Sequence, residues 1–127
     1  MKVLLSIKPE YAEKILRGEK KYEFRKTLFK NPLIKTVVIY ASSPVKKVIG
    51  EFEIDYILSL DIGELWHKTM RYSGIDKEFY DSYFHGKDIG YAIKVKKAVR
   101  YNEYLELGDY DIKYAPQSFI YLGGPQG

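Results

Sequence analysis

The chain has 127 residues, 46% of them hydrophobic and 30% charged, proportions typical of a folded globular protein rather than a disordered one. It contains no cysteine, which excludes a disulfide framework, thiolate catalysis and Cys-ligated zinc. Residues 1–50 hold 12 Lys and Arg against 4 Asp and Glu, whereas residues 51–127 hold 9 against 13. This asymmetry favours a basic face that attracts phosphate, and a lysine-rich solvated surface is the alternative.

The first elements predicted are a buried strand and a helix. Residues 3–7 form a short, mostly apolar run, which is typical of a buried strand. Pro9 suits a first helical turn, apolar residues follow at helical spacing, and Gly18 can adopt the left-handed conformation that ends a helix. The apolar start is too short for a signal peptide or a membrane helix, so we expect a cytoplasmic protein without a membrane partner.

Three strands are predicted next along the chain. Residues 20–26 alternate between aromatic and charged side chains, as a half-buried strand does. Residues 36–41 form a strongly apolar strand, and residues 47–58 form a long alternating one. Gly50, inside the long strand, indicates a bulge or a bend of the kind that a curved sheet needs.

The second half of the chain predicts two helices and two more strands. Asp61 starts a capping-box pattern, and Asp76 precedes a further short helix. Residues 89–97 alternate as a strand, residues 101–107 are ambiguous, and residues 117–122 indicate a last strand. Aromatic residues at helical spacing in the two helices are expected to pack on the sheet. They are Trp66, Phe79, Tyr80, Tyr83 and Phe84.

These elements together predict a single α+β domain over residues 1–127. It would hold about six strands and three helices, with a curved or closed sheet. No linker, low-complexity tract or internal repeat interrupts the chain.

A densely charged segment follows the first helix, at residues 18–25 (Gly-Glu-Lys-Lys-Tyr-Glu-Phe-Arg). Arg25 offers a planar donor fork that suits phosphate or carboxylate, and Lys20 offers a flexible point charge. Strand alternation places Glu23 and Arg25 on one face, where they can form an ion pair, and places Lys20 on the opposite face. Lys20 can join them only if the turn at Gly18 swings it around.

The same segment carries a family resemblance. Gly18, Lys20, Glu23 and Arg25 fit the signature G-x-K-x-x-E-x-R, and Ser-Ile-Lys-Pro before a helix resembles the start of the ASCH domain, a branch of the PUA-like superfamily. Three further segments resemble the family in the expected order, at residues 48–52, 89–93 and 115–119.

The resemblance implies a PUA-like β-barrel of about six strands, with helices covering its openings. It also implies a basic cleft around the signature that binds RNA or a nucleotide-like small molecule. Some ASCH proteins are described as amidohydrolases acting on acylated cytidine, or as ribonucleases, and in an enzyme of either kind Lys20 and Glu23 would be the catalytic pair. The amidohydrolases carry a threonine where this chain has Glu23, which weakens the transfer of their mechanism.

Other residues are predicted to extend the ligand site. Lys8 precedes the positively polarised end of the first helix, and Lys46 enlarges the basic face. Ser42 and Ser43 follow a strand, where they either donate to phosphate or cap a turn. The residues expected to bind RNA or another ligand are Lys8, Gly18, Lys20, Lys21, Glu23, Arg25, Ser42, Ser43, Lys46, Gln117 and Ser118.

Three functions remain open at this point. The preferred one is binding of RNA or a nucleotide-like ligand, and the alternative is a small hydrolase acting on an N-acylated nucleoside or on RNA. A protein-interaction adaptor is the third, and it would present an exposed apolar patch. We expect no cofactor and no metal, since His67 and His85 lack the spacing of metal ligands.

Overall fold

The computed structural model describes residues 1–123 and contains strands, α-helices and two short 3₁₀ turns. The strands are β1 (Lys2–Ile7), β2 (Tyr22–Arg25), β3 (Thr36–Ala41), β4 (Lys47–Asp61), β5 (Ile89–Leu105) and β6 (Ile120–Leu122). The helices are α1 (Pro9–Leu16), α2 (Ile62–Thr69) and α3 (Lys77–Tyr83), and the 3₁₀ turns are η1 (Met70–Tyr72) and η2 (Leu107–Tyr110). The predicted α+β class, with about six strands and three helices, is confirmed.

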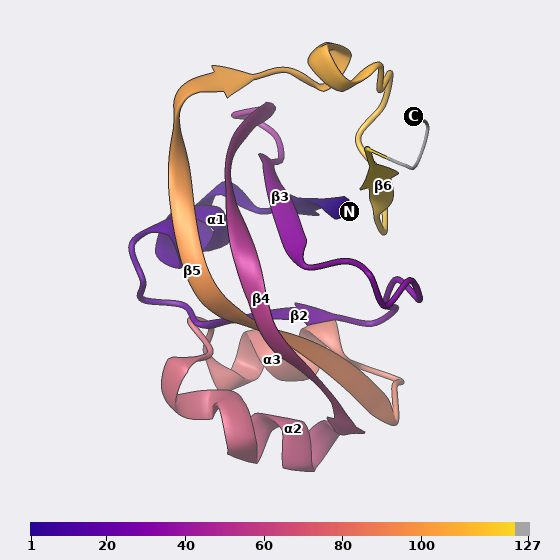
Figure 1. Cartoon of the computed structure of the whole chain (residues 1–127). Helices are drawn as coiled ribbons and strands as arrows, with labels where there is room; N and C mark the ends of the chain where they lie inside the picture. The colour runs from indigo at the N-terminus through magenta and orange to yellow at the C-terminus, as the bar shows by residue number, and fades with distance from the viewer. Residues whose placement is uncertain (124–127) are drawn as a thin grey trace.

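The six strands form one mixed sheet in the order β2-β5-β4-β3-β1-β6. β1 runs parallel to β3, and the other neighbouring pairs are antiparallel. β4 and β5 are long curved ribbons that cross the molecule, and α2 and α3 lie against their lower part (Figure 1). The ambiguous segment after residue 100 is strand as far as Leu105, because it continues the ladder of β5 with β4.

The structure does not confirm the predicted closure into a barrel. Among the described residues, β2 and β6 are the two ends of the sheet, with no ladder between them. β2 has four residues and β6 has three, and β2 ends where the chain leading to β6 passes by. A hydrogen bond from the Arg25 guanidinium to the carbonyl oxygen of Ser118, and one between the hydroxyls of Thr27 and Ser118, span this gap.

A bulge at Gly50 helps the sheet to curve. The pairing of β4 with β5 changes register between Val48 and Gly50. A Cβ atom at Gly50 would lie 2.5 Å from the carbonyl oxygen of Val99, so this close approach of two backbones requires glycine. The predicted bulge is therefore confirmed.

The helix ends also follow the sequence. Gly18 has φ +80 just after α1, as predicted for a residue that ends a helix. The carboxylates of Asp61 and Asp76 accept hydrogen bonds from the backbone N–H groups of Glu64 and Phe79, at 3.1 and 2.8 Å. Both aspartates thus cap their helices, which fixes where α2 and α3 begin.

Apolar residues gather in separate clusters against the sheet. One lies between α1 and the strands around Val37 and Ile39, and another lies between the lower helices and β2. In the lower cluster Tyr80 and Phe84 are buried against Phe24. This packing holds α3 beside β2, where the candidate site is formed. None of the helices in the described residues is long and apolar enough to cross a membrane.

Candidate functional site

A pocket of about 580 Å³ opens between α1, β2, α3 and the segment that precedes β6. These segments are far apart in the sequence, and the fold brings them to one place. Six of the residues predicted to bind a ligand line this pocket, namely Lys8, Lys20, Glu23, Arg25, Gln117 and Ser118.

Two other residues of the charged segment point elsewhere. Gly18 ends α1 and lines a separate, smaller hollow together with Lys21. The Lys21 side chain is exposed, and its Nζ lies 4.6 Å from the ring centre of Tyr72. Strict alternation over residues 20–26 would place Lys21 on the same face as Glu23. The structure places them in different hollows, because β2 begins only at Tyr22.

Ser42, Ser43 and Lys46 lie in the turn between β3 and β4, and they are not among the residues that line the pocket. The Ser42 carbonyl oxygen accepts hydrogen bonds from the backbone N–H groups of Val45 and Lys46. The segment is thus a turn closed by backbone hydrogen bonds, and it lies outside the lining of the pocket.

Lys20 forms the floor of the pocket and is 2% exposed. Its Nζ donates a hydrogen bond of 2.6 Å to the carbonyl oxygen of Ser73. The same atom lies 5.5 Å from the ring centre of Tyr11 and 4.8 Å from that of Phe24. Burial lowers the pKa of Lys20 from 10.5 to about 8, although the charge of Glu23 partly opposes the shift.

Lys20 and Glu23 therefore reach the same pocket, although strand alternation alone placed them on opposite faces. The alternation rule does not apply to Lys20, because it precedes the first residue of β2. The chain turns after Gly18, and the backbone N–H groups of Glu19 and Lys20 both donate to the carbonyl oxygen of Lys14. The turn at Gly18 thus brings the lysine inward, as the sequence allowed.

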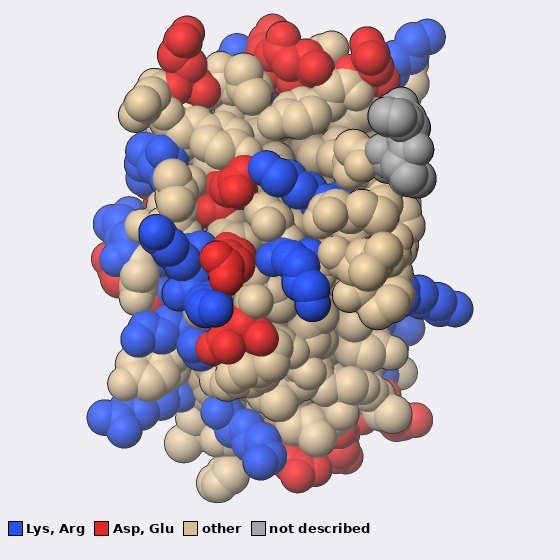
Figure 2. All heavy atoms as spheres, in the orientation of Figure 1, with Lys and Arg blue, Asp and Glu red and all other residues tan. Residues whose placement is uncertain are grey.

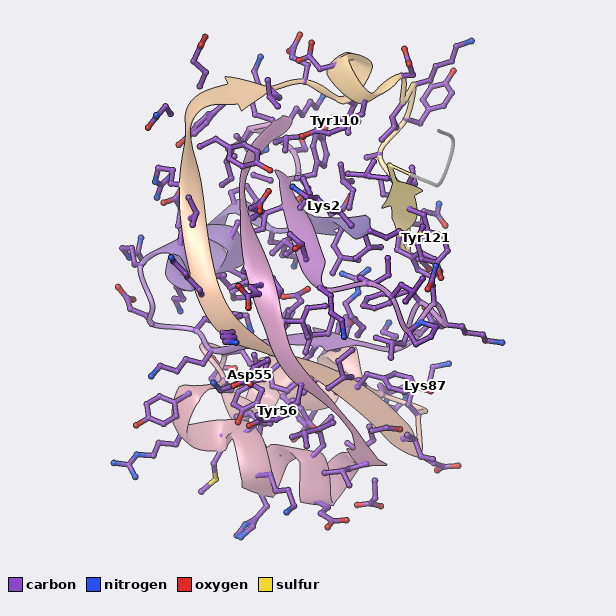
Figure 3. All side chains as sticks on the ribbon, in the orientation of Figure 1. Lys2, Asp55, Tyr56, Lys87, Tyr110 and Tyr121 are labelled. Atoms are coloured by element: carbon purple, nitrogen blue, oxygen red, sulfur yellow. The ribbon has the colours of Figure 1, made fainter. Side chains whose placement is uncertain are left out.

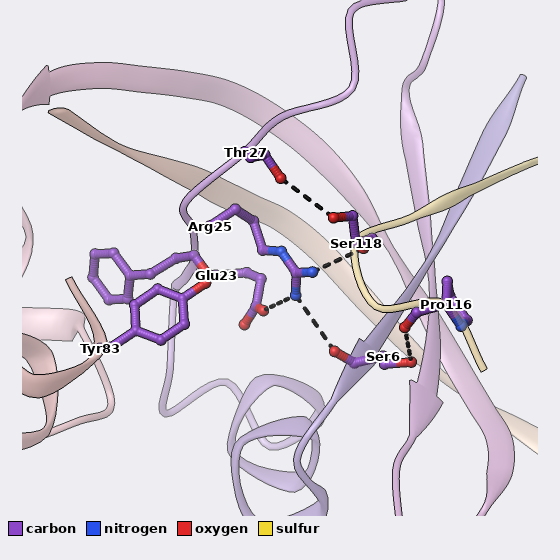
Figure 4. Close-up of polar contacts among 8 residues, drawn as sticks. Ser6, Glu23, Arg25, Thr27, Tyr83, Pro116 and Ser118 are labelled. Carbon is purple, nitrogen blue, oxygen red and sulfur yellow. Dashed lines mark hydrogen bonds and ion pairs between the residues drawn. The ribbon is translucent and has the colours of Figure 1, made fainter. Parts of the chain in front are cut away.

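Glu23 and Arg25 form the predicted ion pair, with 3.3 Å between Glu23 Oε2 and Arg25 Nη1. The guanidinium also donates to the carbonyl oxygens of Ser6, at 3.4 Å, and of Ser118, at 2.8 Å (Figure 4). Arg25 therefore connects the end of β1, β2 and the segment before β6. Its donor fork is directed largely at protein groups, among them the Glu23 carboxylate, which is one of the two partners that the sequence suggested.

We expect Arg25→Ala to lower the free energy of unfolding by about 2 kcal/mol, because it removes hydrogen bonds from a charged donor and leaves Glu23 without its ion-pair partner. Faster amide exchange should be concentrated in residues 116–119. Arg100→Ala is the matched control, since the ion pair of Arg100 with Glu13 is well exposed and such pairs contribute less than about 1 kcal/mol. Equal destabilisation by the two variants would contradict the connecting role of Arg25.

The sequence interpretation assigned Phe79 and Tyr83 to the packed interface with the sheet, but they line the pocket. Their rings are 6.2 Å apart between centres with an interplanar angle of 16°. The Tyr83 hydroxyl donates to the carbonyl oxygen of Phe24 at 3.2 Å, which fixes this ring. The sequence held a signal for this, because two i,i+4 aromatic pairs, Tyr80 with Phe84 and Phe79 with Tyr83, lie in and next to α3. Tyr80 and Phe84 are the buried pair, which leaves the other pair available to line a pocket.

Three lysines surround the mouth of the pocket, and two of them, Lys26 and Lys87, were not predicted. Lys8 Nζ lies 5.1 Å from the ring centre of Phe79, and Lys26 Nζ lies 4.7 Å from that of Tyr83. Lys87 projects from the loop between α3 and β5 (Figure 3). No carboxylate of the described residues forms an ion pair with any of the three. We call Lys8, Lys26 and Lys87 the rim lysines.

The site thus combines flat aromatic rings, a buried ammonium next to a carboxylate, and uncompensated positive charge at its mouth. Such a pocket suits a planar ring that carries an anionic group outside. No cluster of three His, Asp or Glu that could hold a metal ion is found within residues 1–123.

These features define a small α+β domain with a pocket lined by aromatic and cationic side chains. Residues 5–99 match the family model of the ASCH domain, and the chain therefore belongs to the ASCH domain family. The crystal structure of ASCH from Zymomonas mobilis is similar to this chain, with a TM-score of 0.88 and 28% sequence identity. The similarity covers 97% of this chain and 88% of that one.

Curated proteins that contain a similar sequence differ in name. The chain is 35% identical over 121 residues to the large ribosomal subunit protein uL22 of Ureaplasma parvum, covering 94% of this chain and 39% of that protein. It is 34% identical over 85 residues to an ASCH domain-containing ribonuclease of Zymomonas mobilis, covering 67% of this chain and 57% of that protein. The chain thus spans well under two thirds of the length of these relatives.

Proposed function

We propose that this chain binds single-stranded RNA by taking up one nucleotide in the pocket. The observation that carries the proposal is that the rings of Phe79 and Tyr83, which we call the aromatic wall, line the same pocket as the rim lysines. The rim lysines have no ion pair with a described carboxylate. Among the described residues, five lysines away from the pocket do form ion pairs with carboxylates, as Lys2 does with Glu51 and Lys77 with Asp81. The relative named as a ribonuclease agrees with a ligand of this chemical class.

The aromatic wall supports recognition of an unpaired base. The rings of Phe79 and Tyr83 offer a surface on which a base can stack, and every base has such a face. Tyr11 adds a third ring, with its centre 5.3 Å from that of Phe79. A base in a duplex is covered by its neighbours and its partner, so a pocket of this kind selects single strands.

The positions of the charged side chains favour one orientation of the bound nucleotide. Glu23 lies inside the pocket, where its carboxylate repels phosphate but can accept a hydrogen bond from a base N–H group. Lys20, on the floor, can donate to a base oxygen or ring nitrogen. The rim lysines lie outside, where they attract the phosphates. The base therefore points inward, and the backbone crosses the mouth of the pocket.

The rim lysines provide the test. Replacing Lys8, Lys26 and Lys87 together by glutamine should weaken binding of a mixed-sequence RNA of about ten nucleotides, a length within the range of single-strand sites. The slope of log affinity against log salt should fall in magnitude by about 2, because each lost phosphate contact contributes roughly 0.7 for single strands. Fluorescence anisotropy across a salt titration measures this slope.

A charge-matched control shows whether the loss of affinity comes from the rim lysines or from the lower net charge of the protein. Lys30, Lys35 and Lys68 are exposed, and they are not among the residues that line the pocket. Glutamine at these three positions changes the net charge by the same amount. The proposal fails if the two triple variants lose the same affinity and slope, or if the wild-type chain binds no RNA.

RNA cleavage is the second candidate, and the lowered pKa of Lys20 is the observation that favours it. With a pKa of about 8, a useful fraction of the amine is neutral at mildly alkaline pH. Neutral Lys20 could accept the proton of a ribose 2′-hydroxyl as this oxygen attacks the adjacent phosphorus and the bond to the 5′-oxygen breaks. A water molecule that donates a proton to the leaving 5′-oxygen would complete the reaction, giving a 2′,3′-cyclic phosphate and a 5′-hydroxyl.

If Lys20 is the proton acceptor, the rate of RNA cleavage should rise with pH and level off above about pH 8, the pKa of Lys20. The rate is measured with end-labelled RNA. An N-acylated cytidine assayed in parallel tests the amidohydrolase alternative, for which the hydroxyl of Thr27 in the pocket is the relevant group. RNA that is bound but remains intact at every pH would leave binding as the function.

A further inference from the structure

A second hollow, of about 290 Å³, lies on the other side of Lys20 from the pocket. Lys20 lines both spaces, so the two sites share a wall. The second hollow is bordered by four other cationic residues, Arg17, Lys21, Lys94 and Lys96. Gly18 and Lys21, which belong to the charged segment but not to the pocket, are both found here.

Aromatic and cationic side chains continue outward from this hollow. Tyr72 lies between two cations, with Lys21 Nζ 4.6 Å and the Arg71 guanidinium carbon 5.6 Å from its ring centre. Lys21 adjoins β5 through the hydrogen bond from the Val95 N–H group to its carbonyl oxygen.

Lys94, at the border of the second hollow, also lies next to Tyr56. Lys94 pairs in register with Tyr56 of β4, and its Nζ lies 5.9 Å from the Tyr56 ring centre. We call Lys21, Tyr56, Arg71, Tyr72 and Lys94 the outer surface. Figure 3 shows Tyr56 beside Asp55 on the lower part of β4.

The two tyrosines are more exposed than a core position would require. Tyr56 is 44% exposed and Tyr72 is 43% exposed. Tyr56 is fixed by a hydrogen bond of 3.2 Å between its hydroxyl and that of Tyr22. Exposed rings that are held in place and flanked by cations are typical of surfaces that bind single-stranded nucleic acid.

The charge of the outer surface is only partly compensated. Asp55 lies 3.7 Å from Lys94, whereas Lys21 and Arg71 have no ion pair with a described carboxylate. On the face drawn in Figure 2, basic side chains crowd the middle with a few acidic ones between them, and acidic groups also collect at the upper and lower ends. The distribution suits a polyanion that crosses the middle of the molecule.

We infer that the outer surface is a second contact site for the same RNA strand, one nucleotide of which occupies the pocket. Bases beyond the pocket stack on Tyr72 and Tyr56, and the phosphates between them contact Lys21 and Arg71. This inference rests on the proposed function, since the strand is anchored in the pocket. It adds that affinity depends on the length of the RNA.

The test compares a single nucleotide with a longer strand. Tyr72→Ala should weaken binding of a mixed-sequence RNA of about ten nucleotides by roughly 5- to 100-fold, the range found when a stacking ring is removed. Binding of a mononucleotide mixture, measured by NMR titration, should not change. Lys21→Gln should reduce the salt slope for the longer RNA by about 0.7.

A matched variant makes the outcome specific. Tyr114→Ala removes a tyrosine that is 81% exposed and lies elsewhere, so it should leave RNA affinity unchanged. The inference is overturned if Tyr72→Ala binds the longer RNA as the wild type does, which is also the result expected of a protein-docking surface. If the wild type binds neither RNA nor mononucleotides, the proposed function fails as well.

Discussion

Lys20→Met is expected to weaken RNA binding by roughly 10- to 100-fold, the effect of losing a hydrogen bond from a charged donor. Methionine keeps most of the apolar stem that packs beside Phe24, so the shape of the pocket floor is largely retained. The same variant should abolish cleavage, if the chain cleaves RNA, because it removes the proton acceptor.

Lys20→Met should at the same time remove a pH dependence from the stability of the fold. The pKa of Lys20 is about 8 in the folded chain and 10.5 ordinarily, so below pH 8 the charged amine is carried into the folded state at a cost of up to about 3 kcal/mol. Between pH 8 and 10.5 the unfolded chain binds more protons than the folded chain, and the stability of the wild type therefore rises with pH.

Urea unfolding at a series of pH values measures both effects. The wild type should gain stability across this alkaline window, and Lys20→Met should not. Lys68→Met, at an exposed position, serves as the control and should behave as the wild type does. A wild-type stability that stays flat or falls between pH 8 and 10.5 would contradict the burial of a charged Lys20.

Gly74→Ala is expected to destabilise the protein by about 3 kcal/mol and to displace Lys20. Gly74 has φ +72, and an added Cβ would lie 2.4 Å from Lys20 Cγ. The unfavourable backbone conformation costs about 1–2 kcal/mol, and forcing extra volume against a buried side chain costs a further 1–3 kcal/mol. The carbonyl oxygen of the preceding Ser73 holds Lys20 Nζ, so RNA affinity should fall together with stability.

Gly86→Ala is the control that separates the cost of the backbone conformation from the effect of displacing Lys20. Gly86 has φ +81, but an added Cβ there would meet no atom within 4 Å. This variant should cost only the backbone term, about 1–2 kcal/mol, and should bind RNA normally. If the two alanine variants have the same stability and the same affinity, the contact between Gly74 and Lys20 is unimportant.

The helix and strand boundaries could be predicted where local chemistry decides them. Asp61 and Asp76 were recognised as helix starts because a capping carboxylate acts within three residues of its own position. Gly50 was recognised as the site of a bulge or a bend because a glycine inside a strand pattern is typical of such a site. Such features depend on short stretches of sequence.

The pocket could be predicted only in part, because it depends on contacts between distant segments. Glu23 and Arg25 share a strand, so their pairing followed from alternation, whereas Lys20 lies in an irregular turn to which no periodic rule applies. Lys26 and Lys87 read as ordinary surface lysines until the fold places them around the same opening. The barrel prediction failed because the lengths of the end strands depend on where neighbouring segments pass, which a single sequence does not state.

The connection made by Arg25 has a consequence for how the site comes into being. Ser118, whose carbonyl oxygen accepts from the guanidinium, lies 93 residues further along the chain. During synthesis, α1, β2 and α3 all leave the ribosome before the segment that supplies Gln117 and Ser118. A partly made chain can therefore assemble most of the pocket while one wall is missing. The pocket is completed only when this segment, made after the others that line it, joins them through a contact of long sequence separation that forms slowly.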